Sequence, residues 1–230
     1  MKRKISQLMF NKYRDCTPQL PDYNLTADCK WIRHKSGLPW LPLDILVPVE
    51  AILSEIKNIE SLLTDHRDEY AENVGWKSFC IHGKSYNATR EDAYYNDTRP
   101  HSWTPEAIER MPNTVNYFLN HWPKTQFSRL RVMLLESGGH ITIHSDSVIS
   151  ALSPINIAIT QPTDCVFVME NFGVIPFVPG SAYMLDVSNR HTVFNNSPHP
   201  RWHIIIHQAF DQIESQNMVA SSYKKMYNKQ

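Results

Sequence analysis

The second half of this 230-residue chain carries the pattern that most restricts its fold, a series of short apolar segments separated by turn-forming residues. The segments are rich in β-branched residues and recur every 8–12 residues between residues 127 and 210. Such spacing is typical of an antiparallel β-sandwich or barrel, and about eight strands fit a jelly roll, or double-stranded β-helix. The predicted strands are Phe127–Glu136, His140–His144, Leu152–Thr160, Asp164–Glu170, Val174–Val178, Ala182–Val187, His191–Phe194 and Trp202–Phe210.

Helical patterns come before these strands and not between them, which argues against a parallel α/β sheet. Residues 48–63 repeat apolar side chains at helical spacing. A second helical stretch, 104–121, begins with an N-cap threonine and a proline and is predicted to break at Pro112. Short strands are predicted at 74–82, and residues 1–47 are expected to form loops and short strands.

The length suits one domain with a sizeable core. We expect residues 127–212 to form a jelly-roll catalytic core. The N-terminal region, residues 1–126, is expected to be helical or irregular and to pack on that core. Residues 213–230 are expected to be a C-terminal tail.

Composition argues against several classes of protein. The 23 basic and 23 acidic residues balance, so nothing favours a nucleic acid partner. The four cysteines lie far apart without a C-x-x-C pair, which argues against a cysteine zinc site and a disulfide framework. No apolar run has the length of a membrane span, and the run Ile5–Phe10 is interrupted where a signal peptide would need it continuous. We therefore expect a soluble cytoplasmic protein.

His144-Ser145-Asp146 is the first candidate for chemistry. Residues i and i+2 of a strand project to one face, so the imidazole of His144 and the carboxylate of Asp146 can converge on one metal ion. His191 follows a polar turn several strands later and is the candidate third ligand. Two histidines and a carboxylate on one face of an octahedron leave open positions, an arrangement typical of non-haem Fe(II) oxygenases.

Arg201 begins a buried-looking strand, where a permanent charge requires an anionic partner. If His191 and Arg201 flank a hairpin, a dicarboxylate such as 2-oxoglutarate can chelate iron at one end and pair with Arg201 at the other. His203 shares a face with Arg201 by strand alternation and is a further candidate for co-substrate binding. Taken singly, each residue also fits a structural role, as a chance triplet, a core histidine or an ion pair. The hypothesis depends on their combination within one β-rich region.

Residues 127–210 resemble the aspartyl/asparaginyl β-hydroxylase family of Fe(II)- and 2-oxoglutarate-dependent oxygenases, whose relatives include bacterial free amino acid and proline hydroxylases. The matching stretches, with the helical segment 104–121 ahead of them, are Arg129–Glu136 with Gly138-Gly139, His144–Asp146, Leu185–Ser197 and Arg201–Ile206. The resemblance implies a jelly roll that uses Fe(II), 2-oxoglutarate and O₂. It also implies that His144, Asp146 and His191 are catalytic metal ligands and that Arg201 binds the co-substrate.

Two departures from the family pattern concern the site. The best-known animal members lack the carboxylate ligand, whereas Asp146 is present here. The family tends to place a histidine on the next strand, where this chain has Asn156. Asn156 can donate a hydrogen bond to a carboxylate of 2-oxoglutarate, or it can be a strand amide paired with the backbone.

The expected reaction is hydroxylation of an aliphatic C–H bond in an amino acid or peptidyl residue, with release of succinate and CO₂. Desaturation by the same centre stays open, whereas Asp146 argues against halogenation because a halide needs that ligand position. A non-catalytic, cupin-like module that binds a metal or carboxylate is the alternative of another class, and a zinc hydrolase does not explain Arg201. Loop residues on a rigid scaffold often set specificity, and the candidates for substrate contact are Trp76, His82, Arg90 and His101.

Overall fold

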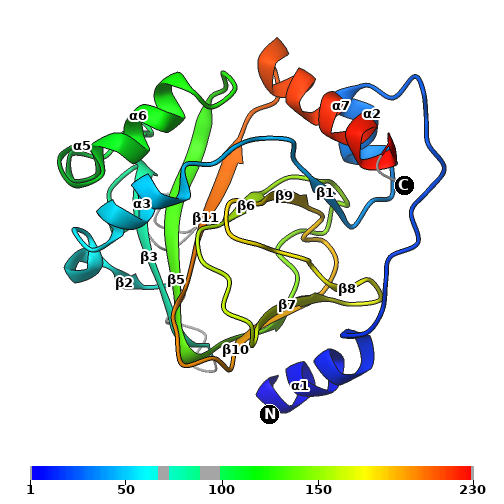
Figure 1. Ribbon diagram of the computed structural model, residues 1–230, viewed down its shortest axis with the longest axis horizontal. Helices are drawn as coiled ribbons and strands as arrows, with labels where there is room; N and C mark the ends of the chain where they lie inside the picture. Colours follow the sequence, from blue (N-terminus) through cyan, green and yellow to red (C-terminus); the bar gives the residue numbers. More distant parts are fainter. Residues whose placement is uncertain (1, 67–72, 89–98, 229–230) are drawn as a thin grey trace.

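The computed structural model describes residues 2–66, 73–88 and 99–228. Within them, eleven strands form one sheet whose pairings are antiparallel, in the order β1-β9-β6-β11-β5-β10-β7-β8, with β3 added on β5 and with β2 and β4 on β3. The strands are β1 (Trp40–Pro42), β2 (Thr64–Asp65), β3 (Val74–Gly83), β4 (Ser102–Trp103), β5 (Phe127–His144), β6 (Ile155–Ala158), β7 (Cys165–Met169), β8 (Gly173–Val174), β9 (Ala182–Leu185), β10 (His191–Asn195) and β11 (Arg201–Gln208). Figure 1 shows the sheet rolled into two layers, which confirms the predicted jelly roll.

Strand β5 belongs to both layers. Its first half pairs with β11 and its second half with β10, while β3 follows it along the other edge. A break at Ser137-Gly138-Gly139 was predicted between the strands Phe127–Glu136 and His140–His144, and this prediction is wrong because β5 continues through these residues. Gly139 allows this continuity: an added Cβ would lie 2.9 Å from the carbonyl oxygen of Val74 on β3 and 2.8 Å from that of Glu136.

Strands β5 and β11 each separate an apolar face from a polar one by simple alternation. One face packs in the main hydrophobic core, and it consists of Leu130, Val132 and Leu134 with Trp202, Ile204 and Ile206. The opposite face points into the roll and carries Arg129, Arg131, Arg201, His203 and His207. The apolar face of β5 and β11 is held against the helices. The charged and imidazole side chains of the opposite face therefore line the interior of the roll.

The helices are α1 (Lys2–Tyr13), α2 (Cys29–Lys35), α3 (Val49–Ile56), the 3-10 helix η1 (Glu60–Leu62), α5 (Pro105–Arg110), α6 (Pro112–Asn120) and α7 (Ile213–Asn228). Helices α3, α5 and α6 lie beside β3 and β5 in Figure 1, and α2 and α7 lie together near β1. The predicted break at Pro112 is confirmed, since α5 ends before it and α6 begins there. The predicted helix 48–63 is too long, because hydrogen bonds between Asn58 and Arg110 of α5 hold the chain in turns after α3.

The structure differs from the predictions at both ends of the chain. Residues 1–47 were expected to form loops and short strands, and they contain the strand β1 but also the helices α1 and α2. Residues 213–230 were expected to be a tail, but α7 buries Ser215, Met218, Val219, Ser222 and Tyr223, which recur at helical spacing. Among the described helices, none combines the length and the apolar character that crossing a bilayer requires.

Candidate metal centre

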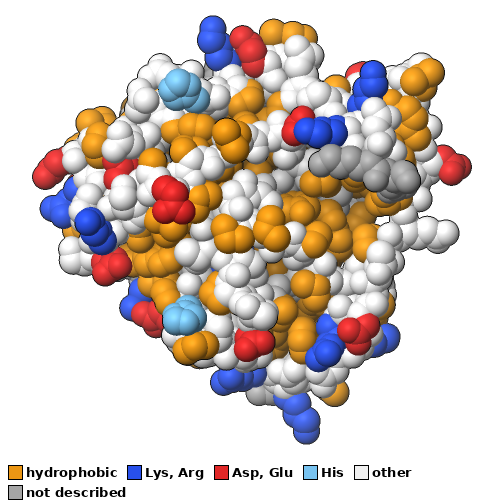
Figure 2. Space-filling model, in the orientation of Figure 1, with side chains coloured by type: hydrophobic (Ala, Val, Ile, Leu, Met, Phe, Trp, Pro, Cys, Tyr) orange, Lys and Arg blue, Asp and Glu red, His pale blue; other side chains and the backbone are white. Residues whose placement is uncertain are grey.

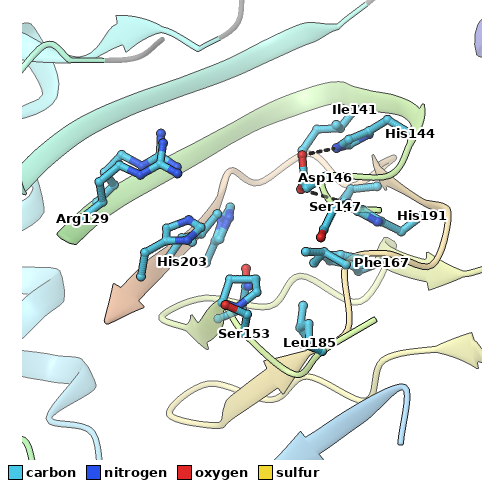
Figure 3. A pocket seen from close by; sticks show the side chains of 18 of the residues that line it. Arg129, Ile141, His144, Asp146, Ser147, Ser153, Phe167, Leu185, His191 and His203 are labelled. Carbon is cyan, nitrogen blue, oxygen red and sulfur yellow. Dashed lines mark ion pairs between the residues drawn. The ribbon is translucent and has the colours of Figure 1, made fainter. Parts of the chain in front are cut away.

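The interior of the roll holds a cavity of about 390 Å³ (Figure 3). Ligand pockets are commonly of this size or larger. Its walls come from the inner faces of β3, β5, β6, β7, β9, β10 and β11, from the loop between β5 and β6, and from helix α2. The three predicted metal ligands, His144, Asp146 and His191, all line it.

Strand pairing brings these three residues together. His144 is the last residue of β5 and His191 is the first residue of β10, and the two face each other in the antiparallel register. Asp146 follows two residues after His144, and its backbone N–H donates to the carbonyl of Val187, 2.9 Å away, in the loop that leads to β10. The two ligand-bearing loops are thus fixed against each other by the backbone.

The side chains converge on one point. His144 Nε2 lies 3.6 Å from Asp146 Oδ1, and His191 Nε2 lies 3.6 Å from Asp146 Oδ2. One donor atom from each of the three residues lies within 4.8 Å of the others. In Figure 3, His144 and His191 flank Asp146 at one end of the cavity.

Backbone hydrogen bonds set the tautomer of both imidazoles. His144 Nδ1 lies 2.7 Å from the carbonyl oxygen of Thr142, and His191 Nδ1 lies 2.9 Å from that of Asn189. A carbonyl only accepts, so both Nδ1 atoms carry the proton and both Nε2 atoms are left with lone pairs beside Asp146. Metal-binding histidines are oriented in this way, and the donor set therefore fits a divalent transition metal.

Asp186 connects the two loops that carry the ligands. Its Oδ2 accepts a hydrogen bond of 2.5 Å from the hydroxyl of Ser150, which follows Asp146. Its Oδ1 accepts from the backbone N–H and the hydroxyl of Ser188, at 3.1 and 2.6 Å, ahead of His191. This buried carboxylate therefore supports the candidate metal centre without facing it.

Arg201 lies on the floor of the same cavity and is 1% exposed. Its Nε donates to Gln161 Oε1 and its Nη1 to His203 Nδ1, each at 3.1 Å. Its Nη2 is buried and has no hydrogen-bond partner among the described residues, and none of the described acidic side chains forms an ion pair with it. Burial lowers the pKa of Arg201, yet a guanidinium keeps its charge. An anion such as a carboxylate of 2-oxoglutarate would satisfy this group.

The contact with Arg201 also fixes the state of His203. Because a guanidinium only donates, Nδ1 of His203 accepts, and the ring proton is on Nε2. Burial, and then the charge of Arg201, hold the pKa of His203 well below its usual value. His203 is therefore a neutral imidazole within the cavity. Asn156 also lines the cavity and is buried, on strand β6 next to β11.

A comparison with family models identifies the protein family of this chain. The model described as aspartyl/asparaginyl β-hydroxylase matches residues 48–209, which is well over half of the 230 residues. The chain belongs to the aspartyl/asparaginyl β-hydroxylase family. The match begins at α3 and includes β3, so the family relationship extends beyond segments 104–121 and 127–210, in which the sequence resemblance was found.

Solved structures show distant similarity to this family member. A 2OG-Fe(II) oxygenase family oxidoreductase from Burkholderia pseudomallei is 10% identical, with 84% of this chain and 94% of that chain covered and a TM-score of 0.44. A prolyl-4-hydroxylase from Pseudomonas putida is 13% identical, with 80% and 99% covered and a TM-score of 0.46. None of the curated protein sequences compared with the chain matches it. Family membership therefore rests on the family model.

The structure places the predicted substrate residues of this β-hydroxylase family member in different parts of the molecule. Trp76 lines the cavity, where its ring packs against His66 with centroids 4.2 Å apart. His82 and His101 instead line a separate cleft beside Trp103, and the structure does not bring them to the metal ligands. Arg90 lies outside the described residues.

Sequence reasoning missed several cavity residues, namely Arg33, His66, Arg129, Arg131 and His207. A signal existed for three of them. Arg129 and Arg131 share the inner face of β5 by alternation, and His207 shares the face of Arg201 and His203 on β11. Arg33 and His66 come from α2 and from the end of β2, and no local pattern points to their position.

Proposed function

We propose that this protein is an Fe(II)- and 2-oxoglutarate-dependent dioxygenase that hydroxylates an aliphatic C–H bond of an amino acid or peptidyl residue. The observation that carries the proposal is the convergence of two imidazole Nε2 atoms and one carboxylate within 4.8 Å. Membership of the aspartyl/asparaginyl β-hydroxylase family supports the same reaction class. The bound metal and co-substrate would supply the oxidation of the C–H bond by O₂, with release of succinate and CO₂.

In this proposal, His144, Asp146 and His191 hold the metal and leave the remaining coordination positions open toward the cavity. Their hydrogen bonds to Thr142 and Asn189 keep both histidines in the ligand tautomer. The preformed ligand geometry reduces the reorganisation that metal binding requires.

Arg201 binds the carboxylate of 2-oxoglutarate that is remote from the metal. Gln161 and His203 each occupy one nitrogen of the guanidinium and orient the group, which leaves Nη2 as the nitrogen that a carboxylate would satisfy. Neutral His203 adds a donor at Nε2 without adding charge, and Asn156 adds an amide from the neighbouring strand β6. Trp76 contributes an apolar wall for the substrate.

We also propose that the protein works in the cytoplasm on a small molecule or a peptide. None of the four cysteines, all of which the structure describes, forms a disulfide, and Cys29, Cys80 and Cys165 are buried thiols, as is usual in a reducing compartment.

Anaerobic titration tests the assignments one by one. We expect the wild-type protein to bind Fe(II), or redox-inert Mn(II) in its place, and then 2-oxoglutarate. His144→Ala and His191→Ala should abolish metal binding. Arg201→Ala should retain the metal but weaken 2-oxoglutarate binding about 10- to 100-fold, as expected for loss of charge-assisted hydrogen bonds.

Arg14→Ala is the matched control, because Arg14 is a half-exposed arginine paired with Asp15, 3.5 Å away. Unchanged 2-oxoglutarate affinity in Arg201→Ala would contradict the role of that residue. Substrate-dependent O₂ uptake and succinate formation distinguish an oxygenase from a module that binds metal without turnover.

A further inference from the structure

Arg201 differs from the basic side chains of the protein surface in what surrounds it. On the face in Figure 2, Lys and Arg side chains are interspersed with Asp and Glu. Arg201 is buried instead, and its two hydrogen-bond partners, Gln161 and His203, are an amide and a neutral imidazole. These contacts hold the guanidinium in place without cancelling the charge that a carboxylate ligand would need.

Three contacts restrict the position of Arg201. Its Nε donates to Gln161 Oε1 and its Nη1 to His203 Nδ1, each at 3.1 Å. The guanidinium carbon also lies over the ring of Phe177, 5.2 Å from its centroid. A planar group that is bonded at two nitrogens and covered by an aromatic ring cannot slide or rotate without losing a contact. The position of the remaining nitrogen, Nη2, is therefore fixed as well.

Gln161 does not line the cavity, and it is itself held in place. It lies in the loop between β6 and β7, where its Nε2 donates to the carbonyl of Cys165, 2.5 Å away. The backbone N–H of Thr160 donates to the carbonyl of Trp202 at 2.9 Å, and the hydroxyl of Thr160 accepts from the backbone N–H of Trp202 at 2.8 Å. The segment that carries Gln161 is therefore bonded to the residue next to Arg201, and Gln161 acts on a cavity ligand through Arg201.

Resting on the proposed function, we propose that Gln161 is a positioning residue that makes the protein selective for the length of its co-substrate. The metal would hold 2-oxoglutarate at its 2-oxo acid end, and Arg201 would hold it at the remote carboxylate. The chain fixes both ends, by His144, Asp146 and His191 at one and by Arg201 at the other. A dicarboxylate that is longer by one methylene, 2-oxoadipate, needs the guanidinium to move away, and Gln161 opposes this movement.

Two variants separate the two contacts that Gln161 makes. Neither methionine nor an ionised glutamate can donate to the carbonyl of Cys165, so Gln161→Met and Gln161→Glu both lose the contact that supports the loop. Beside the guanidinium of Arg201 the carboxyl of the glutamate is ionised, and it still offers an oxygen to Nε, whereas a thioether is a weak acceptor. Loss of loop support alone would affect both variants equally. Loss of positioning affects Gln161→Met.

Calorimetric titration of the Mn(II) protein without O₂, with 2-oxoglutarate and 2-oxoadipate as the probes, tests this proposal. The wild-type protein should bind 2-oxoglutarate about 10-fold or more tightly than 2-oxoadipate, as one methylene typically gives in a fitted site. Gln161→Met should weaken 2-oxoglutarate binding about 10-fold and bring the ratio of the two affinities close to one. Gln161→Glu should bind both dicarboxylates more weakly, because its carboxylate offsets the charge of Arg201, but should keep the wild-type ratio.

Two controls accompany these titrations. 2-Oxopentanoate lacks the remote carboxylate, reports on the metal end alone and should bind equally to the wild type and both variants. Gln216→Met is the matched control, because Gln216 is also partly buried and its Nε2 donates to a backbone carbonyl, that of Phe210, at 3.1 Å. Thermal unfolding checks that each variant is folded. If Gln161→Met is not, Gln161→Asn replaces it, because its amide is one methylene too short to bridge Arg201 and Cys165.

The outcomes separate this proposal from the proposed function. If the wild-type protein binds 2-oxoglutarate and 2-oxoadipate equally well, selectivity for length is refuted and the oxygenase stands. An unchanged ratio in Gln161→Met, or the same loss of ratio in Gln161→Met and Gln161→Glu, would refute positioning by Gln161. Failure of the wild-type protein to bind 2-oxoglutarate at all would refute the oxygenase itself.

Discussion

At the scale of single residues, Asp186 has the contacts that couple the two halves of the metal centre. The loop after Asp146 and the loop before His191 are separate in sequence, and each donates to this one buried carboxylate through Ser150 and Ser188. A ligand set assembled from two loops binds a metal tightly only if the loops keep their spacing. Asp186 is therefore a positioning residue for the metal ligands.

Asp186→Asn tests this role. The amide keeps the shape, but its NH₂ group faces a hydroxyl or N–H that previously donated to oxygen. We expect metal affinity to fall about 10- to 100-fold, the range found for residues that orient metal ligands. Anaerobic Mn(II) titration measures the effect. Asp44→Asn is the matched control, because Asp44 is half-exposed and pairs with Lys225 of α7. Wild-type metal affinity in a folded Asp186→Asn protein would contradict the role.

At the scale of elements, helix α6 begins against a carboxylate from helix α3. Glu55 is 4% exposed and accepts four hydrogen bonds. The donors are the backbone N–H and side-chain amide of Asn113 and the backbone N–H and hydroxyl of Thr114, at 2.7 to 2.9 Å. A negative charge at a helix N-terminus also interacts favourably with the helix dipole. Glu55 thus takes the place of a local N-cap, since α6 has no side-chain cap at Met111.

Glu55→Gln should therefore lower the free energy of unfolding by about 1.5–3 kcal/mol, as expected for loss of hydrogen bonds to a charged group. Chemical denaturation measures it. Glu50→Gln, at an exposed site in the first turn of the same helix, should stay within about 0.5 kcal/mol of the wild type. Equal stability of the two variants would show that the buried carboxylate adds nothing beyond a neutral amide.

Local patterns predicted some elements and not others. The helix start at Thr104 and the break at Pro112 follow from backbone preferences, so sequence alone located α5 and α6. Continuity of β5 through Gly138-Gly139 depends on pairing with β3, a long-range contact, and the two glycines looked like a turn. Helix α7 was missed although its buried side chains recur at helical spacing, because two of the five are serines and the apolar pattern is weak.

At the scale of the whole molecule, the sequence likewise predicted some residues of the site and not others. His144, Asp146, His191 and Arg201 were predicted because residue type and spacing together restrict their chemistry, and the fold brings all four to one cavity. Arg33 was not predicted, because α2 reaches the cavity through packing that no sequence spacing encodes. His82 was a candidate for the substrate site only by its chemical type, and the fold places it in another cleft.

The N-terminal helix shows how a distant element supports the metal centre. Helix α1 lies against β5 and β7, and Phe10 packs edge-on against Phe194 of β10, with ring centroids 5.9 Å apart. Ser6 is fully buried, and its hydroxyl accepts a hydrogen bond of 2.8 Å from the backbone N–H of Ile143. Ile143 precedes His144, so α1 stabilises the end of the strand that presents the first metal ligand.

Ser6→Ala removes this acceptor and leaves the partly buried N–H of Ile143 without its hydrogen bond to α1. Such a change should cost about 1–3 kcal/mol. We expect faster hydrogen exchange at the amide of Ile143 and weaker Mn(II) binding, because His144 moves with the freed strand end. Ser54→Ala is the control, since the exposed hydroxyl of Ser54 bonds only to Ala51 within α3. If exchange at Ile143 speeds up while metal affinity stays at the wild-type value, α1 stabilises the strand but does not position the ligand.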